Sequence, residues 1–307
     1  MKQAFFIISL FSLNLYAQES KQPIIDMHLH CYDQTNYFVA PDQYGKMAPK
    51  NVDEHFNQTY ELMKKYNIVK GVISGSFNAV NTWMDRDNDR RFIRGISMFA
   101  PGEIDTIQFE KWVKERKIEI FGEIGAVYEG YSLNHPGYEP YLRICEKYDI
   151  PVAIHTGGGP PKITYIGRPN FRLLKGDPLL VEDVLVKFPK LRMYMMHAGE
   201  VFYERALRMM GLYPQLYVDL GVLLWVHPMT KSYAKDFLKK AKEFGFIDRV
   251  MFGSDQMVWP HGIEMSIEYL KSLSFLSEEE KRGILFDNAA RFLKLDKSEI
   301  SKYYIQK

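Results

Sequence analysis

The chain lacks several features that define common protein classes. Its only cysteines among 307 residues are Cys31, directly after a histidine pair, and Cys145, inside a predicted helix, so we expect two free, buried thiols. The formal net charge is only +2, without a long block of like charges, so no nucleic-acid partner is expected. No Gly-x-Gly-x-x-Gly turn follows the first predicted strand, which removes the main support for an open dinucleotide-binding sheet.

The amino terminus has the composition of a targeting segment. Lys2 provides a short positive region, residues 4–16 are largely apolar, and the following Ala17 fits a small-residue cleavage site. The apolar stretch is too short for a comfortable transmembrane helix. We therefore expect a signal peptide over residues 1–17 and an exported mature domain over residues 18–307, periplasmic or secreted and without stable membrane insertion. An uncleaved membrane anchor is the alternative.

Strand-like and helix-like runs alternate along the rest of the chain. Eight apolar runs predict strands, at residues 23–30, 69–74, 92–99, 118–123, 151–155, 191–197, 216–220 and 249–253. The intervening segments predict helices, at 52–66, 82–90, 105–116, 138–148, 178–188, 202–210 and 231–244, with two more at 263–273 and 278–295. The strands show little polar alternation, which is typical of parallel strands buried on both faces. The pattern predicts an α/β fold, a single-domain (β/α)8 TIM barrel; an open doubly wound sheet is the alternative.

Ligand-type side chains lie at the ends of these predicted strands. His28 and His30 are two residues apart on one strand, so both imidazoles point to the same side and can reach one metal ion. Four further candidates end later strands: Glu123, His155, His197 and Asp255. Because the carboxyl ends of barrel strands form one ring, we expect a metal centre there. Imidazole and carboxylate ligands suit Zn²⁺, one ion or two, with Mn²⁺ or Fe²⁺ possible.

The same segments resemble the amidohydrolase superfamily of metal-dependent TIM-barrel hydrolases, from residue 24 to about residue 295. The matching segments are IIDMHLH at 24–30, GEIG at 122–125, IPVAIHTG at 150–157, MMHAG at 195–199 and MFGSD at 251–255. The tail ILFDNAARFL at 284–293 is similar to the closing helix of the amidohydrolase 2 branch.

The resemblance implies a role for each position. His28, His30 and Asp255 would hold one metal ion. In members with one ion, His155 completes the set and His197 orients or activates water. In members with two ions, His155 and His197 hold the second ion and a carboxylate bridges the two.

Two carboxylates then have special roles. Glu123 lies where the related TatD-like and phosphotriesterase-like branches have a bridging glutamate, which slightly favours two ions. Asp255 would accept the proton of the nucleophilic water and deliver it to the leaving group.

Two long connections, residues 31–51 and 156–177, follow strands that carry candidate ligands, and we interpret them as pocket walls. Candidate substrate-binding residues are those that lie in these connections or shortly after the ends of the predicted strands. Arg168 and Arg172 could clamp a carboxylate or phosphate, or be solvated loop charges. Tyr128, Trp225 and Trp259 follow strand ends, where they either shape the pocket or only pack.

The sequence therefore predicts a metal-dependent hydrolase that acts on an ester, lactone, amide or phosphoester bond of a small molecule. A homodimer is possible. A metal-dependent decarboxylase of a carboxylic acid is the second hypothesis, because the amidohydrolase 2 branch resembles both. Expected export and an intact Glu123 favour hydrolysis. A non-catalytic metal-binding or ligand-binding barrel is the third hypothesis, and the complete ligand set argues against it.

Overall fold

Eight parallel strands pair in chain order in the computed structural model, which describes residues 22–305. The strands are β1 (Ile24–His30), β2 (Ile68–Ser74), β3 (Phe92–Met98), β4 (Ile120–Ile124), β5 (Val152–His155), β6 (Met193–Met196), β7 (Leu216–Asp219) and β8 (Val250–Met251). Two backbone hydrogen bonds close the sheet between β1 and the segment after β8, Met27 N to Phe252 O at 2.9 Å and Asp255 N to His28 O at 2.8 Å. The predicted barrel is confirmed.

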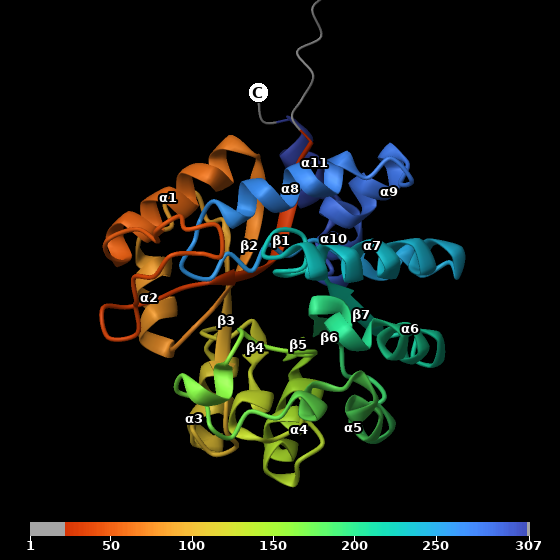
Figure 1. Ribbon diagram of the computed structural model, residues 1–307. Helices are drawn as coiled ribbons and strands as arrows, with labels where there is room; N and C mark the ends of the chain where they lie inside the picture. Colours follow the sequence, from red (N-terminus) through yellow and green to blue (C-terminus); the bar gives the residue numbers. More distant parts are fainter. Residues whose placement is uncertain (1–21, 306–307) are drawn as a thin grey trace, which may run out of the picture.

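Helices surround the strands in sequence order (Figure 1). They are α1 (Val52–Lys65), α2 (Phe77–Asp85), α3 (Thr106–Lys114), α4 (Glu139–Tyr148), α5 (Glu182–Lys187), α6 (Tyr203–Leu212), α7 (Pro228–Glu243), α8 (Gly262–Ser272), α9 (Glu278–Arg282), α10 (Asn288–Phe292) and α11 (Lys297–Ile305). Short 3₁₀ turns lie in the connections: η1 (Ala126–Glu129), η2 (Pro136–Tyr138), η3 (Ile163–Tyr165), η4 (Leu173–Gly176), η5 (Pro178–Val181), η6 (His197–Phe202) and η7 (Ile247–Arg249). A π-helical turn, η8 (Gly283–Asp287), joins α9 to α10.

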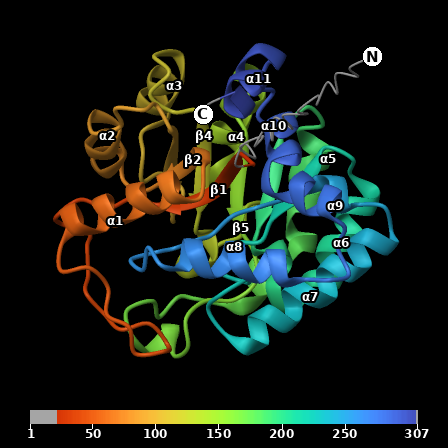
Figure 2. The same ribbon diagram turned by 90° about the horizontal axis from the view of Figure 1, so that it is seen from above.

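The core has two parts. One lies between the strands and the surrounding helices and includes Trp83 and Phe109. The other fills the barrel interior, where Met27 and Met251 pack with Phe286. Figure 2 shows α10 and α11 at one end of the barrel and the long loops after β1 and β5 at the opposite end. The packed interior therefore leaves one end of the barrel for the site.

One predicted helix was misplaced. The helix expected at 82–90 is α2, which begins at Phe77 because the Ser76 hydroxyl accepts the Ala79 N–H at 3.1 Å and caps its first turn. The helix buries Trp83 against the barrel, whereas the polar residues that suggested a later helix follow its end. The helix expected at 278–295 is present over residues 278–292, where α9, η8 and α10 follow one another without a break and η8 is a π-helical turn.

Both cysteines are buried and free, which confirms that expectation. Of the helices that the structure describes, none combines the length and apolar character needed to span a membrane. The predicted signal peptide, residues 1–17, lies outside the described residues.

Replacement of Phe286 by alanine is expected to lower the free energy of unfolding by about 3–5 kcal/mol, because its fully buried ring packs in the barrel interior. Chemical denaturation of both proteins measures the difference. Phe244→Ala is the matched control, since that side chain is 52% exposed and should cost little. An equal loss in the two variants would contradict this role of Phe286.

Candidate metal centre

The six predicted ligand-type side chains converge at the carboxyl ends of the strands. His28 and His30 end β1, Glu123 lies in β4, and His155 ends β5. His197 directly follows β6, and Asp255 lies four residues after the end of β8. The His30 side chain is 21% exposed and each of the others is less than a tenth exposed, so solvent reaches the cluster on the His30 side.

Four of these side chains form what we term the first half-site. His30 Nε2 lies 3.1 Å from Asp255 Oδ1 and 3.2 Å from Glu123 Oε2. His28 Nε2 lies 3.6 Å from the same Glu123 oxygen and 3.8 Å from the same Asp255 oxygen. Two imidazoles and two carboxylates therefore direct one atom each toward a common point.

The other oxygen of Glu123 belongs to a second half-site. Glu123 Oε1 lies 2.6 Å from His155 Nδ1 and 3.7 Å from His197 Nε2, and these two nitrogens are 3.0 Å apart. One carboxylate thus lies between two groups of imidazole nitrogens, with one oxygen facing each group.

Hydrogen bonds on the outer side orient three imidazoles. Each outer ring nitrogen faces an acceptor: His28 Nδ1 faces Asp219 Oδ2 at 3.1 Å, His155 Nε2 faces Gly158 O at 2.6 Å, and His197 Nδ1 faces Gly221 O at 3.0 Å. Because a carbonyl or carboxylate oxygen only accepts, the outer nitrogen carries the hydrogen and a neutral ring keeps a lone pair on its inner nitrogen. This arrangement is typical of histidines that bind metal ions.

The residues fit a divalent cation. Among the described residues, buried His28 Nε2 and Asp255 Oδ1 make no hydrogen bond, and an unsatisfied buried polar atom is costly unless something else binds it. If both rings are neutral and protonated at their outer nitrogens, His155 Nδ1 and His197 Nε2 present two lone pairs 3.0 Å apart, and a cation beside them would relieve their repulsion. Imidazole and carboxylate ligands suit zinc, manganese or ferrous iron.

Electrostatics also favour a cation. Burial alone would raise the pKa of Glu123, but hydrogen bonds from the surrounding imidazoles outweigh it and hold that pKa well below its usual range. Burial likewise opposes ionisation of Asp255, yet the charges of His28 and His30 lower its pKa to about 2. Burial would lower the pKa of His30, but Asp255 and Glu123 raise it to about 9. Without a cation, protons on the imidazoles balance these two ionised carboxylates, and a divalent cation would take the place of those protons.

Two supporting residues were missed by the sequence analysis. Asp219 is fully buried at the end of β7, where its Oδ1 accepts the backbone N–H groups of His197 and Gly221, both at 2.9 Å. Gln256 holds the backbone of His30, accepting its N–H at 2.9 Å and donating to its carbonyl at 2.8 Å. The position of Asp219 at a strand end could have identified it, whereas nothing in the pattern marks Gln256.

The backbone around the centre is conformationally demanding. His197 and Asp255 have left-handed φ angles of 62° and 46°, which non-glycine residues rarely adopt and which cluster at functional sites. A Cβ on Gly221 would lie 2.5 Å from His28 Nδ1, so only glycine leaves room for that ring.

Replacement of Asp219 by asparagine is expected to weaken metal binding by about 10–100-fold, because an amide cannot accept all three hydrogen bonds that orient the His28 ring and the nearby backbone. Competition with a chelator of known affinity measures the change. Asp87→Asn is the matched control, since Asp87 also accepts three hydrogen bonds, from Tyr60 Oη and from two backbone N–H groups at the start of β3. Equal metal affinity in wild type and Asp219→Asn would contradict this role of Asp219.

The predicted substrate-binding residues differ in their distance from the centre. The half-buried Tyr128 ring lies 5.0 Å from the His155 ring. Arg168 pairs with Glu129 at 2.5 Å and lies over the Phe99 ring.

The other three make local contacts. Arg172 donates to the carbonyls of its own loop. Trp225 is fully buried and donates to Ser254 O, and Trp259 donates to Ala40 O, both at 2.9 Å.

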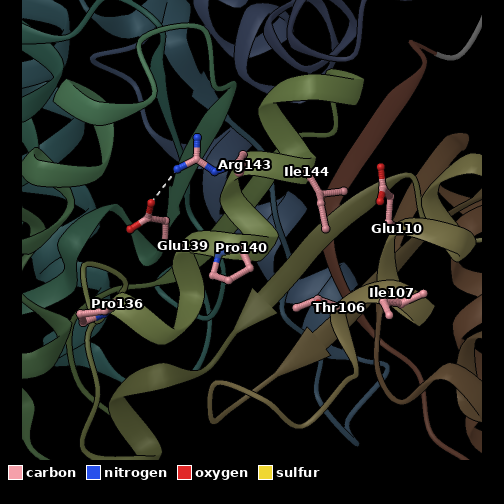
Figure 3. A pocket seen from close by; sticks show the side chains of 8 residues that line it. All are labelled: Thr106, Ile107, Glu110, Pro136, Glu139, Pro140, Arg143 and Ile144. Carbon is pink, nitrogen blue, oxygen red and sulfur yellow. Dashed lines mark hydrogen bonds and ion pairs between the residues drawn. The ribbon is translucent and has the colours of Figure 1, made fainter.

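A separate groove of about 420 Å³ lies on the outer surface between α3 and α4 (Figure 3). Apolar side chains such as Ile107 line it beside an ion pair of Glu139 and Arg143. None of the predicted site residues lines this groove, so it is distinct from the metal centre.

Known proteins resemble this chain in fold and, over part of its length, in sequence. A probable 2-pyrone-4,6-dicarboxylic acid hydrolase from Acinetobacter baumannii has a TM-score of 0.62 at 16% identity, covering 89% of this chain and 99% of its own. A 2,6-dihydroxybenzoate decarboxylase from Rhizobium has a TM-score of 0.58 at 16% identity, covering 90% and 99%. Both identities are low, so these structures support the fold alone.

Protein fluG of Emericella nidulans is 22% identical over 162 residues, which are 48% of this chain but only 18% of that longer protein. The amidohydrolase family model matches residues 25–295, which include all six candidate ligands. The chain therefore belongs to the amidohydrolase 2 family of TIM-barrel proteins.

Proposed function

We propose that the protein is a hydrolase that uses two divalent metal ions, zinc or manganese being suitable, to cleave an ester, lactone, amide or phosphoester bond of a small molecule. The observation that carries this proposal is the division of the Glu123 carboxylate between the two half-sites. One oxygen faces His28 and His30, and the other faces His155 and His197. A single carboxylate in this position can join two ions.

The bound ions would polarise a carbonyl or phosphoryl oxygen and lower the pKa of water. His28, His30, Asp255 and Glu123 would hold one ion, and Glu123, His155 and His197 the other. Asp255 is ionised at neutral pH, so its carboxylate is available to accept the proton of the attacking water and to return it to the leaving group. With only one ion, His197 would instead take this proton.

Decarboxylation of a carboxylic acid is the second candidate, because a decarboxylase shares this fold at 16% identity. The buried His197 would then protonate the carbanion that remains after CO₂ loss; its ring lies 5.1 Å from that of His28. Export, proposed from the composition of residues 1–17, supports hydrolysis instead, because decarboxylation of aromatic acids is usually an intracellular step.

The test is metal content per chain, measured on protein purified without chelator or metal-binding tag and then assayed on panels of esters, lactones and phosphoesters. We expect two equivalents of metal and hydrolysis that a chelator abolishes and added Zn²⁺ or Mn²⁺ restores. One equivalent, with CO₂ release from aromatic acids and no hydrolysis, would support the decarboxylase. Failure to bind metal after incubation with either ion would overturn both.

A further inference from the structure

Apolar exposure on this protein is concentrated in two loops. Sixteen large apolar side chains of the described residues are exposed, and eight of them lie in residues 31–51 and 156–177, four in each. Phe38 is 50% exposed and Tyr165 is 88% exposed. These loops contain 43 of the 284 described residues, so half of the exposed apolar side chains belong to less than a sixth of that part of the chain. Such clusters mark binding surfaces.

Both loops border the metal centre. They begin directly after His30 and His155, and Figure 2 shows them along the same edge of the molecule, opposite α10 and α11. His30 is also the most exposed of the candidate ligands. A molecule that reaches the ligands from solvent therefore passes residues of these loops.

Aromatic contacts connect the first half-site to the exposed part of the first loop. The Tyr32 ring stacks on the His30 ring at 6.2 Å, and the Phe38 ring packs edge-on against Tyr32 at 6.3 Å. Phe38 also contacts Trp259 at 6.4 Å. The Trp259 indole donates to Ala40 O, so the loop is fixed against the segment after β8. An apolar surface thus continues outward from a metal ligand.

A similar series leaves the second half-site. The Tyr128 ring lies 5.0 Å from the His155 ring and 5.6 Å from the Phe171 ring, which belongs to the second loop. The same loop carries the exposed side chains of Tyr165 and Ile166. Each half-site therefore has its own apolar wall.

Charge narrows the kind of molecule that fits. The two loops carry six lysines and arginines but only three aspartates. Two of these acids are already paired, Asp42 with His261 and Asp177 with Arg205. One of the basic side chains, Arg168, is paired with Glu129, so unpaired basic side chains still outnumber unpaired acids. A cationic group would be repelled here, whereas an uncharged or anionic apolar molecule would not.

We infer that the substrate carries an extended apolar group, alkyl or aryl, beside the bond that is cleaved, and that this group packs between the two loops. The inference rests on the proposed function. It predicts discrimination by chain length, because each methylene that leaves water adds binding free energy.

The experiment compares the metal-loaded protein with ligands that differ only in apolar length. Binding of decanoate and of butyrate is measured by calorimetry, and kcat/KM is measured for decanoate and butyrate esters of one alcohol. We expect decanoate to bind roughly tenfold more tightly or better, and its ester to be preferred by a similar factor.

Variants locate the preference. Phe38→Ser and Tyr165→Ser should each reduce the decanoate-to-butyrate ratio, roughly threefold or more, and the double variant should reduce it further. Tyr165 is so exposed that its replacement leaves the fold intact. Ile107→Ser is the matched control, because Ile107 is 79% exposed but lies in the outer groove of Figure 3, and its ratio should equal that of wild type.

The outcomes separate the two proposals. Hydrolysis without chain-length preference, or with one that Phe38→Ser and Tyr165→Ser leave unchanged, would overturn this inference and retain the proposed function. Tight decanoate binding that depends on both loops, without hydrolysis of any ester, would support the apolar site and contradict the proposed function. Sedimentation that shows a dimer disrupted by Tyr165→Ser, with an unchanged ratio, would assign the loops to a second copy of the chain and overturn the inference.

Discussion

Replacement of Asp255 by asparagine should lower kcat by about 10²–10⁴-fold, the range over which a positioned acid–base group contributes. The carboxylate has a pKa of about 2 in its buried setting, so it is ionised and available to take a proton from water. An asparagine keeps the size and one oxygen of the side chain but cannot accept and return that proton. Steady-state kinetics on the best hydrolysed substrate, with metal content measured in parallel, provide the test.

A matched control keeps the backbone conformation constant. Asp149 also has a left-handed φ, 56° against 46° for Asp255, and it pairs with Arg192 and Lys294 away from the metal centre. Asp149→Asn should leave kcat near that of wild type. Wild-type kcat in Asp255→Asn with its metal retained would show that another group handles the proton.

Replacement of Glu123 by glutamine should reduce metal content from two equivalents to one and lower the rate of hydrolysis by roughly 100-fold or more. The glutamate oxygens face different half-sites, at 3.2 Å from His30 Nε2 and 2.6 Å from His155 Nδ1. A glutamine has only one oxygen to offer, and its NH₂ group would occupy a ligand position in the other half-site. One ion therefore loses a negatively charged ligand that no neighbour replaces.

Metal analysis of the purified variant measures this change, and addition of excess Zn²⁺ tests whether the second site is weakened or lost. Glu110→Gln is the control, because Glu110 lies on α3 beside the outer groove, where it pairs with Lys147. Two tightly held equivalents in Glu123→Gln would mean that this glutamate does not join two ions. One equivalent in the wild type would favour the single-ion alternative.

The barrel and the six candidate ligands could be predicted because both depend on local pattern. Apolar runs of strand length mark each β-strand, and a histidine or carboxylate at the end of such a run lies at the carboxyl end of the barrel. That rule found His28, His155 and Asp255 although they are far apart in the chain. It also applied to Asp219, which ends β7 and was overlooked among the apolar residues of its strand.

Other features had no local signal. The beginning of α2 depends on a hydrogen bond from one Ser76 side chain, and the composition of the following residues pointed elsewhere. The left-handed backbone at His197 and Asp255 opposes the intrinsic preference of both residues and is maintained by surrounding contacts. Gln256 is near Asp255 in sequence, but its role appears only because closure of the barrel brings it against the backbone of His30.

The sequence by itself determined the fold class, the end of the barrel that carries the chemistry and the kind of ligand there. These depend on the alternation of apolar strand-like runs with helical segments and on which side chain ends each run, and both can be read from the order of residues. Only the tertiary structure decided how the six candidate ligands divide between the two half-sites. Which oxygen of Glu123 faces which imidazoles, and which nitrogen of His28 carries a hydrogen, depend on distances across the closed barrel. Such distances join residues nearly 200 positions apart, and no local pattern encodes them.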